Sequence, residues 1–336
     1  MIKDQLIIKR SIQLFLILFL LSIPVVWLSL QFTNYQGDLT RIGKWSAADF
    51  IGQHPQPSIS KDLLISHPIN EADILVVGDS FSENLQWQSV YHQHGFKVTT
   101  LLWSDVSFIC EDFTKNIEAV GFRGKKIIIE SIERVAAMEV DKSIHCTEGR
   151  QLEGNPHIKG YSKILSSFNK QQTINLNGQF IAGLQTIFHS LSLEWIPNYP
   201  NFHNYNSKST HIYPLEKGCQ VFSHKHCNYG LFFYEDYQQD ELNKKTIKQI
   251  NLLNKRINHG DQYEITWVII PNKSSIYQRF ISGKFWDVLE KYNLGPNLYS
   301  YLKDKSTKVI DLYQPNDTHF SNTGYLILGD KLLNSN

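Results

Sequence analysis

The sequence predicts an α/β fold in which a parallel sheet, covered by helices on both faces, follows one membrane-spanning helix. Two observations lead to this prediction. A long uncharged apolar stretch lies near the N-terminus, and downstream of it short apolar runs alternate with amphipathic segments of helical period. The composition, 42% hydrophobic and 19% charged over 336 residues, is that of a globular protein with a sizeable core. A net charge of +1 gives no reason to expect nucleic acid as a partner.

The apolar stretch SIQLFLILFLLSIPVVWLSLQF covers residues 11–32 without a charge, and about 20 such residues cross a bilayer core. It is followed by no small-residue cleavage site and no lipobox cysteine, so we expect an uncleaved anchor, with a buried core helix as the alternative. Basic residues precede it: Lys3, Lys9 and Arg10. They predict that residues 1–10 stay in the cytoplasm and that the rest lies outside the inner membrane, in the periplasm of a Gram-negative cell.

Four cysteines fit an oxidising compartment, since an even number favours disulfides. Of the three possible pairings, we expect Cys110–Cys146 and Cys219–Cys227. The segment CQVFSHKHC, residues 219–227, also contains His224 and His226. A zinc site is therefore an alternative there, although no CxxC motif supports it.

Residues 33–70 are polar and turn-rich and are expected to connect the anchor to a domain over residues 71–336. Five apolar runs in this domain predict strands: 73–78, 96–103, 125–131, 263–270 and 308–313. Helical segments are expected over 82–95, 236–260 and 277–293. Residues from about 150 to 230 show little periodicity, which indicates an insertion that partly covers a site or forms a small subdomain.

The first strand-like run, DILVVG, leads directly into Asp79 and Ser80. In open parallel sheets ligands bind beyond the carboxyl ends of the strands, where a helix N-terminus stabilises an oxyanion. Ser80 is therefore a candidate nucleophile. After the last strand-like run come Asp317 and His319, two residues apart on one loop. Together they predict a Ser80–His319–Asp317 triad, against the alternative of an ordinary turn and an ordinary helix cap.

The blocks VVGDSFSENL and DTHFSNTGY resemble those of the SGNH (GDSL-like) hydrolase superfamily. The resemblance implies a flavodoxin-like α/β/α sandwich, with the nucleophilic serine in the first block and the histidine and aspartate in the last. More narrowly, the chain is similar to the SGNH-like polysaccharide O-acetyltransferases related to the alginate O-acetylation proteins. Besides the Asp-x-His spacing, the segments that carry this likeness are GDLTRIGKWSAADFIG, KIIIESIERV and VIIPNKSSIY.

The chain departs from those proteins in two ways. Their Asp-x-His motif precedes the serine block, whereas here it follows. The usual Gly-x-Asn-Asp block has no counterpart, because ESIERV, residues 130–135, occupies its expected place. The backbone N–H of Ser80 is then the remaining candidate for the oxyanion hole.

Four further residues are secondary candidates for oxyanion or substrate binding. Arg134 offers positive charge, or else an ion pair with Glu130 or Glu133. Lys273 and Tyr277 are expected either to line the pocket or to be ordinary loop residues. Asp79 is expected to orient the serine turn.

The resulting expectation is a membrane-anchored periplasmic O-acetyltransferase that acetylates an exported polysaccharide through an acetyl-serine intermediate. Neither a metal nor a cofactor is expected, and the sequence contains no Walker-type loop or GxGxxG motif. By resemblance, a multi-pass membrane acyltransferase would deliver the acetyl group. The alternatives are a carbohydrate O-acetyl esterase with the same triad, and a non-catalytic SGNH-like partner of a polysaccharide-modification machine.

Overall fold

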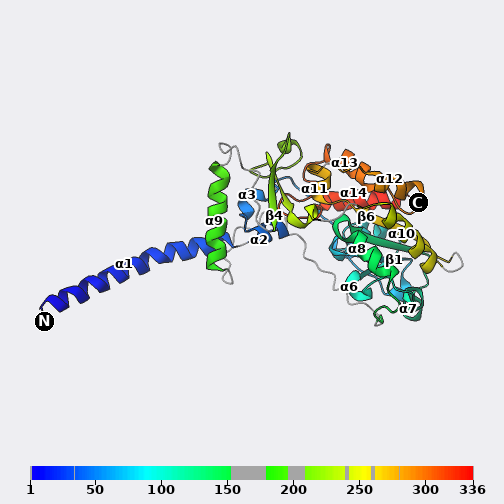
Figure 1. Cartoon of the computed structure of the whole chain (residues 1–336), viewed down its shortest axis with the longest axis horizontal. Helices are drawn as coiled ribbons and strands as arrows, with labels where there is room; N and C mark the ends of the chain where they lie inside the picture. Colours follow the sequence, from blue (N-terminus) through cyan, green and yellow to red (C-terminus); the bar gives the residue numbers. More distant parts are fainter. Residues whose placement is uncertain are drawn as a thin grey trace.

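The computed structural model describes residues 2–33, 35–152, 179–195, 209–238, 242–258, 262–279 and 281–335. Its main sheet has four parallel strands in the order β2-β1-β3-β6, and the parallel sheet itself was predicted from the apolar runs. The strands are β1 (Ile74–Gly78), β2 (Val98–Leu102), β3 (Lys126–Ile132) and β6 (Glu264–Ile270). Every residue of β1 is buried. Because successive side chains of a strand point to opposite faces, both faces of the sheet are covered (Figure 1).

Short helices and one longer amphipathic helix surround this sheet. They are α4 (Ser80–Glu83), α5 (Gln88–Gln93), α6 (Trp103–Val106), α7 (Phe113–Ala119), α8 (Glu133–Ile144), α10 (Lys244–Ile257), α11 (Lys273–Tyr277), α12 (Lys284–Lys291), α13 (Leu298–Ser306) and α14 (Asn322–Leu333), with 3-10 turns η1 (Lys61–Leu63) and η2 (Ile69–Glu71). The helix expected over 82–95 is divided into α4 and α5, because Leu85 adopts φ 57° between them. The helix expected over 236–260 is α10, which begins after its cap Asn243.

The apolar run 308–313 forms no strand, so that prediction is wrong. Asp311 adopts φ 54°, which interrupts the extended conformation. Its carboxylate instead accepts hydrogen bonds from Ser223, one of them from the backbone N–H at 3.0 Å. Only a single bridge, between Tyr313 and Phe320, remains of strand pairing in this segment. The chain therefore reaches the Asp317–His319 loop through a turn that is tied to another part of the molecule.

A small subdomain combines residues from the expected connector with residues from the expected insertion. It consists of α2 (Asp38–Gly43), α3 (Ala47–Phe50), α9 (Phe180–Trp195) and the antiparallel pair β4 (Thr210–Pro214) and β5 (Tyr229–Phe233), with the turns η5 (Gly218–Gln220) and η6 (Tyr234–Tyr237). Its own apolar core contains Leu39, Trp45, Phe50, Leu193, Ile212 and Leu231. The rest of the expected insertion, 153–178 and 196–208, lies outside the described residues.

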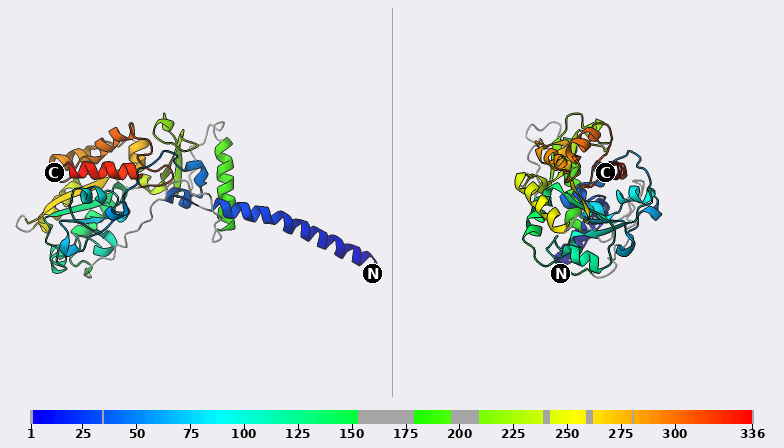
Figure 2. Two further views of the ribbon diagram at one scale, coloured as in Figure 1. Left: turned by 180° about the vertical axis from the view of Figure 1, so that it is seen from behind. Right: turned by 90° about the vertical axis from the view of Figure 1, so that its right-hand side faces the viewer.

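Helix α1 (Ile2–Phe32) projects away from the rest of the chain (Figure 2). The part from Gln5 to Phe32 is long and apolar enough to cross a membrane, and none of its most apolar window is buried inside the protein. The alternative of a core helix therefore does not hold for the described chain. Pro24 lies within the helix, as membrane-spanning helices tolerate.

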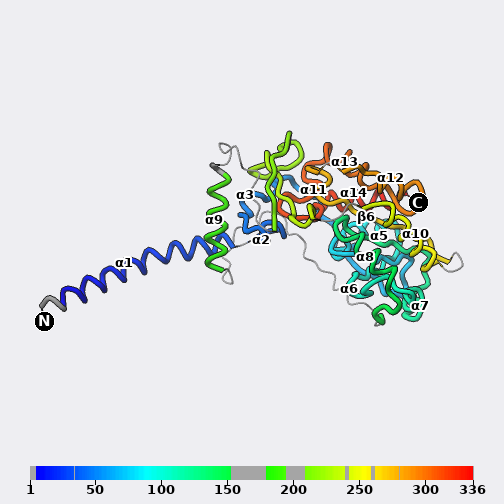
Figure 3. Tube along the Cα trace, in the orientation of Figure 1, coloured from blue at the N-terminus to red at the C-terminus, as the bar shows by residue number. Residues whose placement is uncertain are grey.

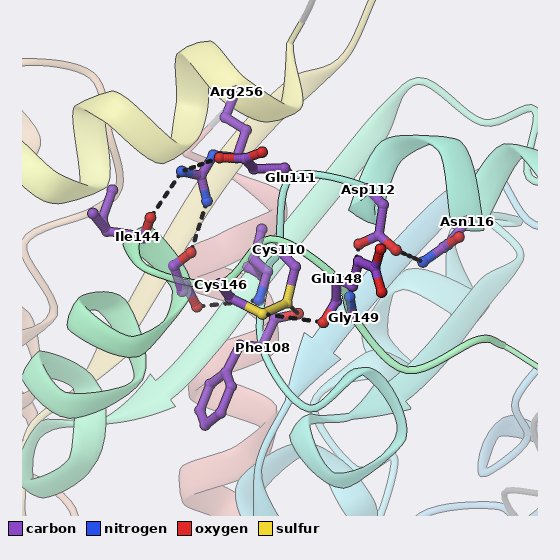
Figure 4. Close-up of a disulfide and its surroundings, with 12 residues drawn as sticks. Phe108, Cys110, Glu111, Asp112, Asn116, Ile144, Cys146, Glu148, Gly149 and Arg256 are labelled. Carbon is purple, nitrogen blue, oxygen red and sulfur yellow. Dashed lines mark hydrogen bonds and ion pairs between the residues drawn. A yellow bond between two sulfur atoms is a disulfide. The ribbon is translucent and has the colours of Figure 1, made fainter.

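Both expected disulfides are present. Cys110–Cys146 joins the loop after β2 to the end of α8 (Figure 4), and Cys219–Cys227 closes the loop between β4 and β5. Around the first bridge, Arg256 of α10 donates hydrogen bonds to two carbonyl groups of the α8 terminus, at 2.7 and 2.9 Å. Since the two cysteines of CQVFSHKHC are bonded to each other, their thiolates do not form the zinc site considered as an alternative.

Candidate active site

Ser80 lies at the carboxyl edge of the parallel sheet, as the first residue of α4. Asp79 caps this short helix, because its Oδ1 accepts a hydrogen bond from the backbone N–H of Phe81 at 2.8 Å. Gly78 is required directly before it, since a Cβ at this position would come within 2.7 Å of Glu130 Oε2. The strand thus delivers the serine into a sharp, tightly packed turn, and the side chain remains partly exposed.

The structure brings Ser80, His319 and Asp317 together into one hydrogen-bonded array. His319 Nε2 lies 2.7 Å from Ser80 Oγ, and its Nδ1 lies 2.6 Å from Asp317 Oδ1. The same carboxylate oxygen accepts the backbone N–H of His319 at 3.0 Å. In this arrangement Nδ1 carries a proton toward Asp317, and Nε2 is the acceptor for the serine hydroxyl.

The electrostatics of the pair suit a general base. Burial favours the neutral forms of His319 and Asp317, but the opposite charge of its partner favours the ionised form of each. Burial alone would lower the pKa of His319, whereas the charge and hydrogen bond of Asp317 raise it above its ordinary value. Burial alone would raise the pKa of Asp317, whereas His319 holds it below its usual range. Asp317 therefore stays ionised while His319 exchanges a proton.

A second carboxylate, Asp38 of α2, contacts the same loop. Its Oδ1 accepts from the backbone N–H of Thr318 at 2.8 Å, and its Oδ2 accepts from the Thr318 hydroxyl at 2.5 Å. The backbone N–H of Asp38 donates to Asp317 Oδ2 at 3.0 Å. Burial, followed by the neighbouring charge of Asp317, raises the pKa of Asp38 to about 6. Sequence reasoning missed this residue; its only signal is the Gly-Asp pair that opens GDLTRIGKWSAADFIG.

Residues adjoining Asp38 also hold the loop that carries Asp317 and His319. The carbonyl of Gln36 accepts from the Asn316 side-chain amide at 2.5 Å, and the backbone N–H of Thr40 donates to the Asn316 carbonyl at 3.4 Å. The segment that follows α1 is thus part of the wall of the candidate site.

Asp79 organises the serine turn, as expected. Besides capping α4, its Oδ2 accepts from the backbone N–H of Ile132 at 2.9 Å, which ties the turn to the end of β3. Below it, Glu130 Oε2 accepts from the Asp79 N–H at 3.0 Å and from the Ser82 hydroxyl at 2.7 Å. Glu130 is completely buried, and burial together with the charge of Asp79 raises its pKa well above the ordinary value. Burial thus favours the neutral form of this carboxyl group beneath Ser80.

The segment ESIERV occupies the place where SGNH proteins usually have the asparagine of the oxyanion hole. Its side chains instead make hydrogen bonds within the protein. Ser131 donates to Glu139 Oε2 at 2.5 Å, and Glu133 Oε2 accepts from the backbone N–H of Asn272 at 2.8 Å. Burial raises the pKa of Glu133 to about 7 and that of Glu139 to about 8. These acidic side chains have no N–H to offer an oxyanion. The N–H of Ser80, at the first position of α4, has no acceptor within the helix and remains available.

Lys273 lies beneath the loop that carries Asp317 and His319. It is buried, and its Nζ donates to the carbonyls of Gln314, Pro315 and Asp317, at 2.7, 2.8 and 3.2 Å. Burial lowers its pKa to about 7, against the opposing effect of nearby carboxylates, Asp317 first. The lysine thus fixes the backbone that presents the aspartate.

The other two secondary candidates do not reach the triad. Arg134 pairs with Asp236 at 3.6 Å, rather than with Glu130 or Glu133, and lies over the Phe233 ring at 5.3 Å. Its contacts join α8 to the small subdomain. Tyr277 packs its ring against Phe222, with the centroids 4.6 Å apart. Both residues have structural contacts that account for their positions.

One group of side chains in the described part of the chain has the composition of a metal site. Asp38, Asp317 and His319 each offer a ligand atom, and these atoms lie within 4.8 Å of one another. The same atoms already serve the hydrogen bonds of the triad and of Thr318, so hydrogen bonding accounts for their convergence.

Comparisons of the chain with protein-family models, with curated proteins and with solved structures find no match. The geometry around Ser80 therefore carries the functional argument.

Proposed function

We propose that the chain is a membrane-anchored serine O-acetyltransferase of the SGNH-like group, acting in the periplasm on an exported polysaccharide. The observation that carries the proposal is the continuous array from Ser80 Oγ through His319 to Asp317, at the carboxyl edge of a parallel sheet. A serine hydroxyl hydrogen-bonded to an imidazole, which in turn is oriented by an ionised carboxylate, is the arrangement that activates a nucleophile.

The strand order supports the family assignment. The sheet runs β2-β1-β3-β6, the flavodoxin-like order 2-1-3-4 with β6 as the fourth strand. Ser80 follows β1, the strand at which this order reverses, and the loop with Asp317 and His319 precedes the last helix, α14. This is the chain order of the SGNH blocks.

The geometry supports a two-step reaction. Ser80 Oγ attacks the carbonyl carbon of an acetyl ester while its proton passes to His319 Nε2. The tetrahedral intermediate then collapses, and His319 returns the proton to the departing oxygen of the donor, which leaves acetyl-Ser80. A sugar hydroxyl next attacks the acetyl carbon and loses its proton to His319. The second tetrahedral intermediate collapses to the acetylated sugar, and His319 returns the proton to the departing Ser80 Oγ. Asp317 stabilises the imidazolium in both steps, and the N–H of Ser80 faces the developing oxyanion.

The placement of the enzyme rests on α1 and the cysteines. The apolar helix gives a single anchor with its basic flank inside, and two disulfides fit an oxidising compartment. Acetyl donors such as acetyl-CoA are cytoplasmic, so the reaction needs a partner that carries acetyl groups across the membrane. A multi-pass membrane acyltransferase has that role in the proposal.

An O-acetyl esterase is the second candidate, because the same triad serves hydrolysis when water replaces the sugar. The test uses the full chain in detergent, incubated with p-nitrophenyl acetate in the presence and absence of candidate oligosaccharides. Mass spectrometry follows acetyl groups on Ser80 and on sugar, and Ser80→Ala is the control. An adduct on Ser80 that moves to sugar supports the transferase, whereas acetate release that sugar does not change supports the esterase. Equal behaviour of wild type and Ser80→Ala would exclude both and leave a non-catalytic role.

A further inference from the structure

Helix α9 carries an unusual surface. Its first 13 residues, FIAGLQTIFHSLS, contain no charged side chain. The large apolar side chains on one of its faces are exposed, with 71% exposure for Ile181 and 63% for Phe188. The full set is Phe180, Ile181, Leu184, Phe188 and Leu191, which we call the α9 stripe. Four of these positions follow the spacing i, i+3, i+7, i+10, so they lie along one side of the helix.

The opposite side of α9 packs against α1 and the small subdomain. Near the start of α9, Gly183 lies so close to α1 that a Cβ would fall within 2.6 Å of the Ser29 Cα. Thr186 bonds to the hydroxyl of Tyr35 at 2.9 Å, and His189 Nδ1 lies 2.8 Å from the Lys44 carbonyl. Leu193 is buried in the core of the small subdomain. These contacts fix the rotation of the helix and turn the α9 stripe away from the small subdomain.

The contact with α1 occurs where its apolar span ends. Ser29 lies in the last turn before Phe32, the end of the segment able to cross a membrane. Figures 1 and 3 show α9 running across α1 rather than along it, with the small subdomain on one side and the exposed length of α1 extending from the other. The α9 stripe therefore faces the side on which α1 would be surrounded by lipid.

We propose that α9 is an interfacial helix that lies in the outer surface of the bilayer, with the α9 stripe among the lipid chains. Lipid is the occupant favoured by continuity, since the stripe adjoins the lipid-facing surface of α1. The proposal rests on α1 spanning the membrane but not on the acyl-transfer chemistry. Two attachments, α1 through the bilayer and α9 along it, would fix the orientation of the small subdomain, whose α2 contributes Asp38 to the site.

The test places single nitroxide labels on the full chain, reconstituted with phosphatidylethanolamine and phosphatidylglycerol as the only other components. The labelled variants are Phe188→Cys on the stripe, Leu20→Cys as the membrane reference, and Leu252→Cys, an exposed position on α10, as the water reference. Collision with oxygen reports lipid, and collision with a water-soluble nickel chelate reports solvent. We expect the Phe188 label to match Leu20 in preferring oxygen, at every protein-to-lipid ratio, while Leu252 prefers nickel.

Two results would overturn the proposal while α1 remains inserted. A Phe188 label that behaves like Leu252, while Leu20 remains in lipid, would show that α9 lies in water although α1 is inserted. Shielding that disappears on dilution into lipid would assign the stripe to a second copy of the chain. A Leu20 label in water would instead refute the membrane placement of α1, on which both proposals depend.

Discussion

Asp38 gives the Asp317–His319 loop a second carboxylate, 3.8 Å from His319 Nδ1, and it does so from the segment that follows α1. Its hydrogen bonds go to Thr318 and Asp317, so it positions the loop without touching Ser80. Its negative charge also contributes to the raised pKa of His319, after the effects of Asp317. The charge of Asp38 and its hydrogen bonds can therefore be separated by substitution.

We predict that Asp38→Asn shifts the acidic limb of the pH profile of kcat/KM to lower pH. The base must be neutral to accept the serine proton, so activity is lost as pH falls through the pKa of His319. Removing the charge of Asp38 lowers that pKa, while the single asparagine oxygen still accepts one of the two hydrogen bonds from Thr318. The plateau rate should fall roughly fivefold, for a hydrogen-bond loss of about 1 kcal/mol.

The profile is measured with p-nitrophenyl acetate, and Asp62→Asn, at an exposed acid of η1, is the matched control. If Asp38 had only a structural role, its substitution would lower kcat/KM without shifting the acidic limb of the pH profile. An unmoved limb would therefore remove Asp38 from the electrostatics of the site.

At the scale of elements, the loop from Gln314 to His319 depends on a buried cation. Lys273 begins α11, directly after the turn that follows β6, and its three donor protons match the three carbonyls that it meets. Without the ammonium group these carbonyls would lose their partner in a buried setting, where an unpaired polar group is costly.

Lys273→Met is expected to lower the free energy of unfolding by about 3 kcal/mol, because methionine keeps the length and loses the donors. The turnover rate should also fall, roughly tenfold or more, as the aspartate loses its fixed position. Thermal denaturation and esterase rates measure the two effects. Lys308→Met, at an exposed lysine paired with Asp304, is the control and should change neither. Wild-type stability in Lys273→Met would contradict the role given to this lysine.

The elements also show what could be predicted from the sequence. Four of the five apolar runs form the parallel sheet, because a strand buried on both faces is continuously apolar and easily recognised. The fifth run forms no strand because the carboxylate of Asp311 accepts a hydrogen bond from Ser223. This contact is distant in the sequence, so a local sequence pattern cannot predict it. Ser80, Asp317 and His319 were found because each follows an apolar run. Asp38 follows only the membrane-spanning run, which forms no strand of the sheet, and its partner Asp317 is 279 residues away along the chain.

On the scale of the whole molecule, the candidate site is assembled from three distant parts of the chain. The main sheet supplies Ser80, the C-terminal loop supplies Asp317 and His319, and the exit of the anchor supplies Asp38. The same exit segment packs α2 into the small subdomain, which in turn binds α1 through α9. If the proposed chemistry is correct, we expect a soluble fragment to be active only when its N-terminus retains this segment.

We predict that a fragment beginning at Tyr35 keeps the esterase activity of the full chain, whereas one beginning at Leu39 loses most of it. Both lack α1 and both retain Leu39 in the core of the small subdomain, while the shorter fragment also loses the hydrogen bond between Tyr35 and Thr186 of α9. They differ in Gln36 and Asp38, which hold Asn316 and Thr318 of the catalytic loop.

Both fragments are exported with a cleavable signal so that the disulfides form, and p-nitrophenyl acetate hydrolysis and melting temperature are compared. Loss of two anchors of the loop should lower kcat/KM by about 100-fold, for roughly 3 kcal/mol of positioning. The melting temperatures should stay close, because the main core lies in the sheet domain, away from the deleted residues. Equal rates would show that the C-terminal loop holds His319 in place alone. In that case the segment after α1 would connect the membrane helix to the domain without helping to position His319.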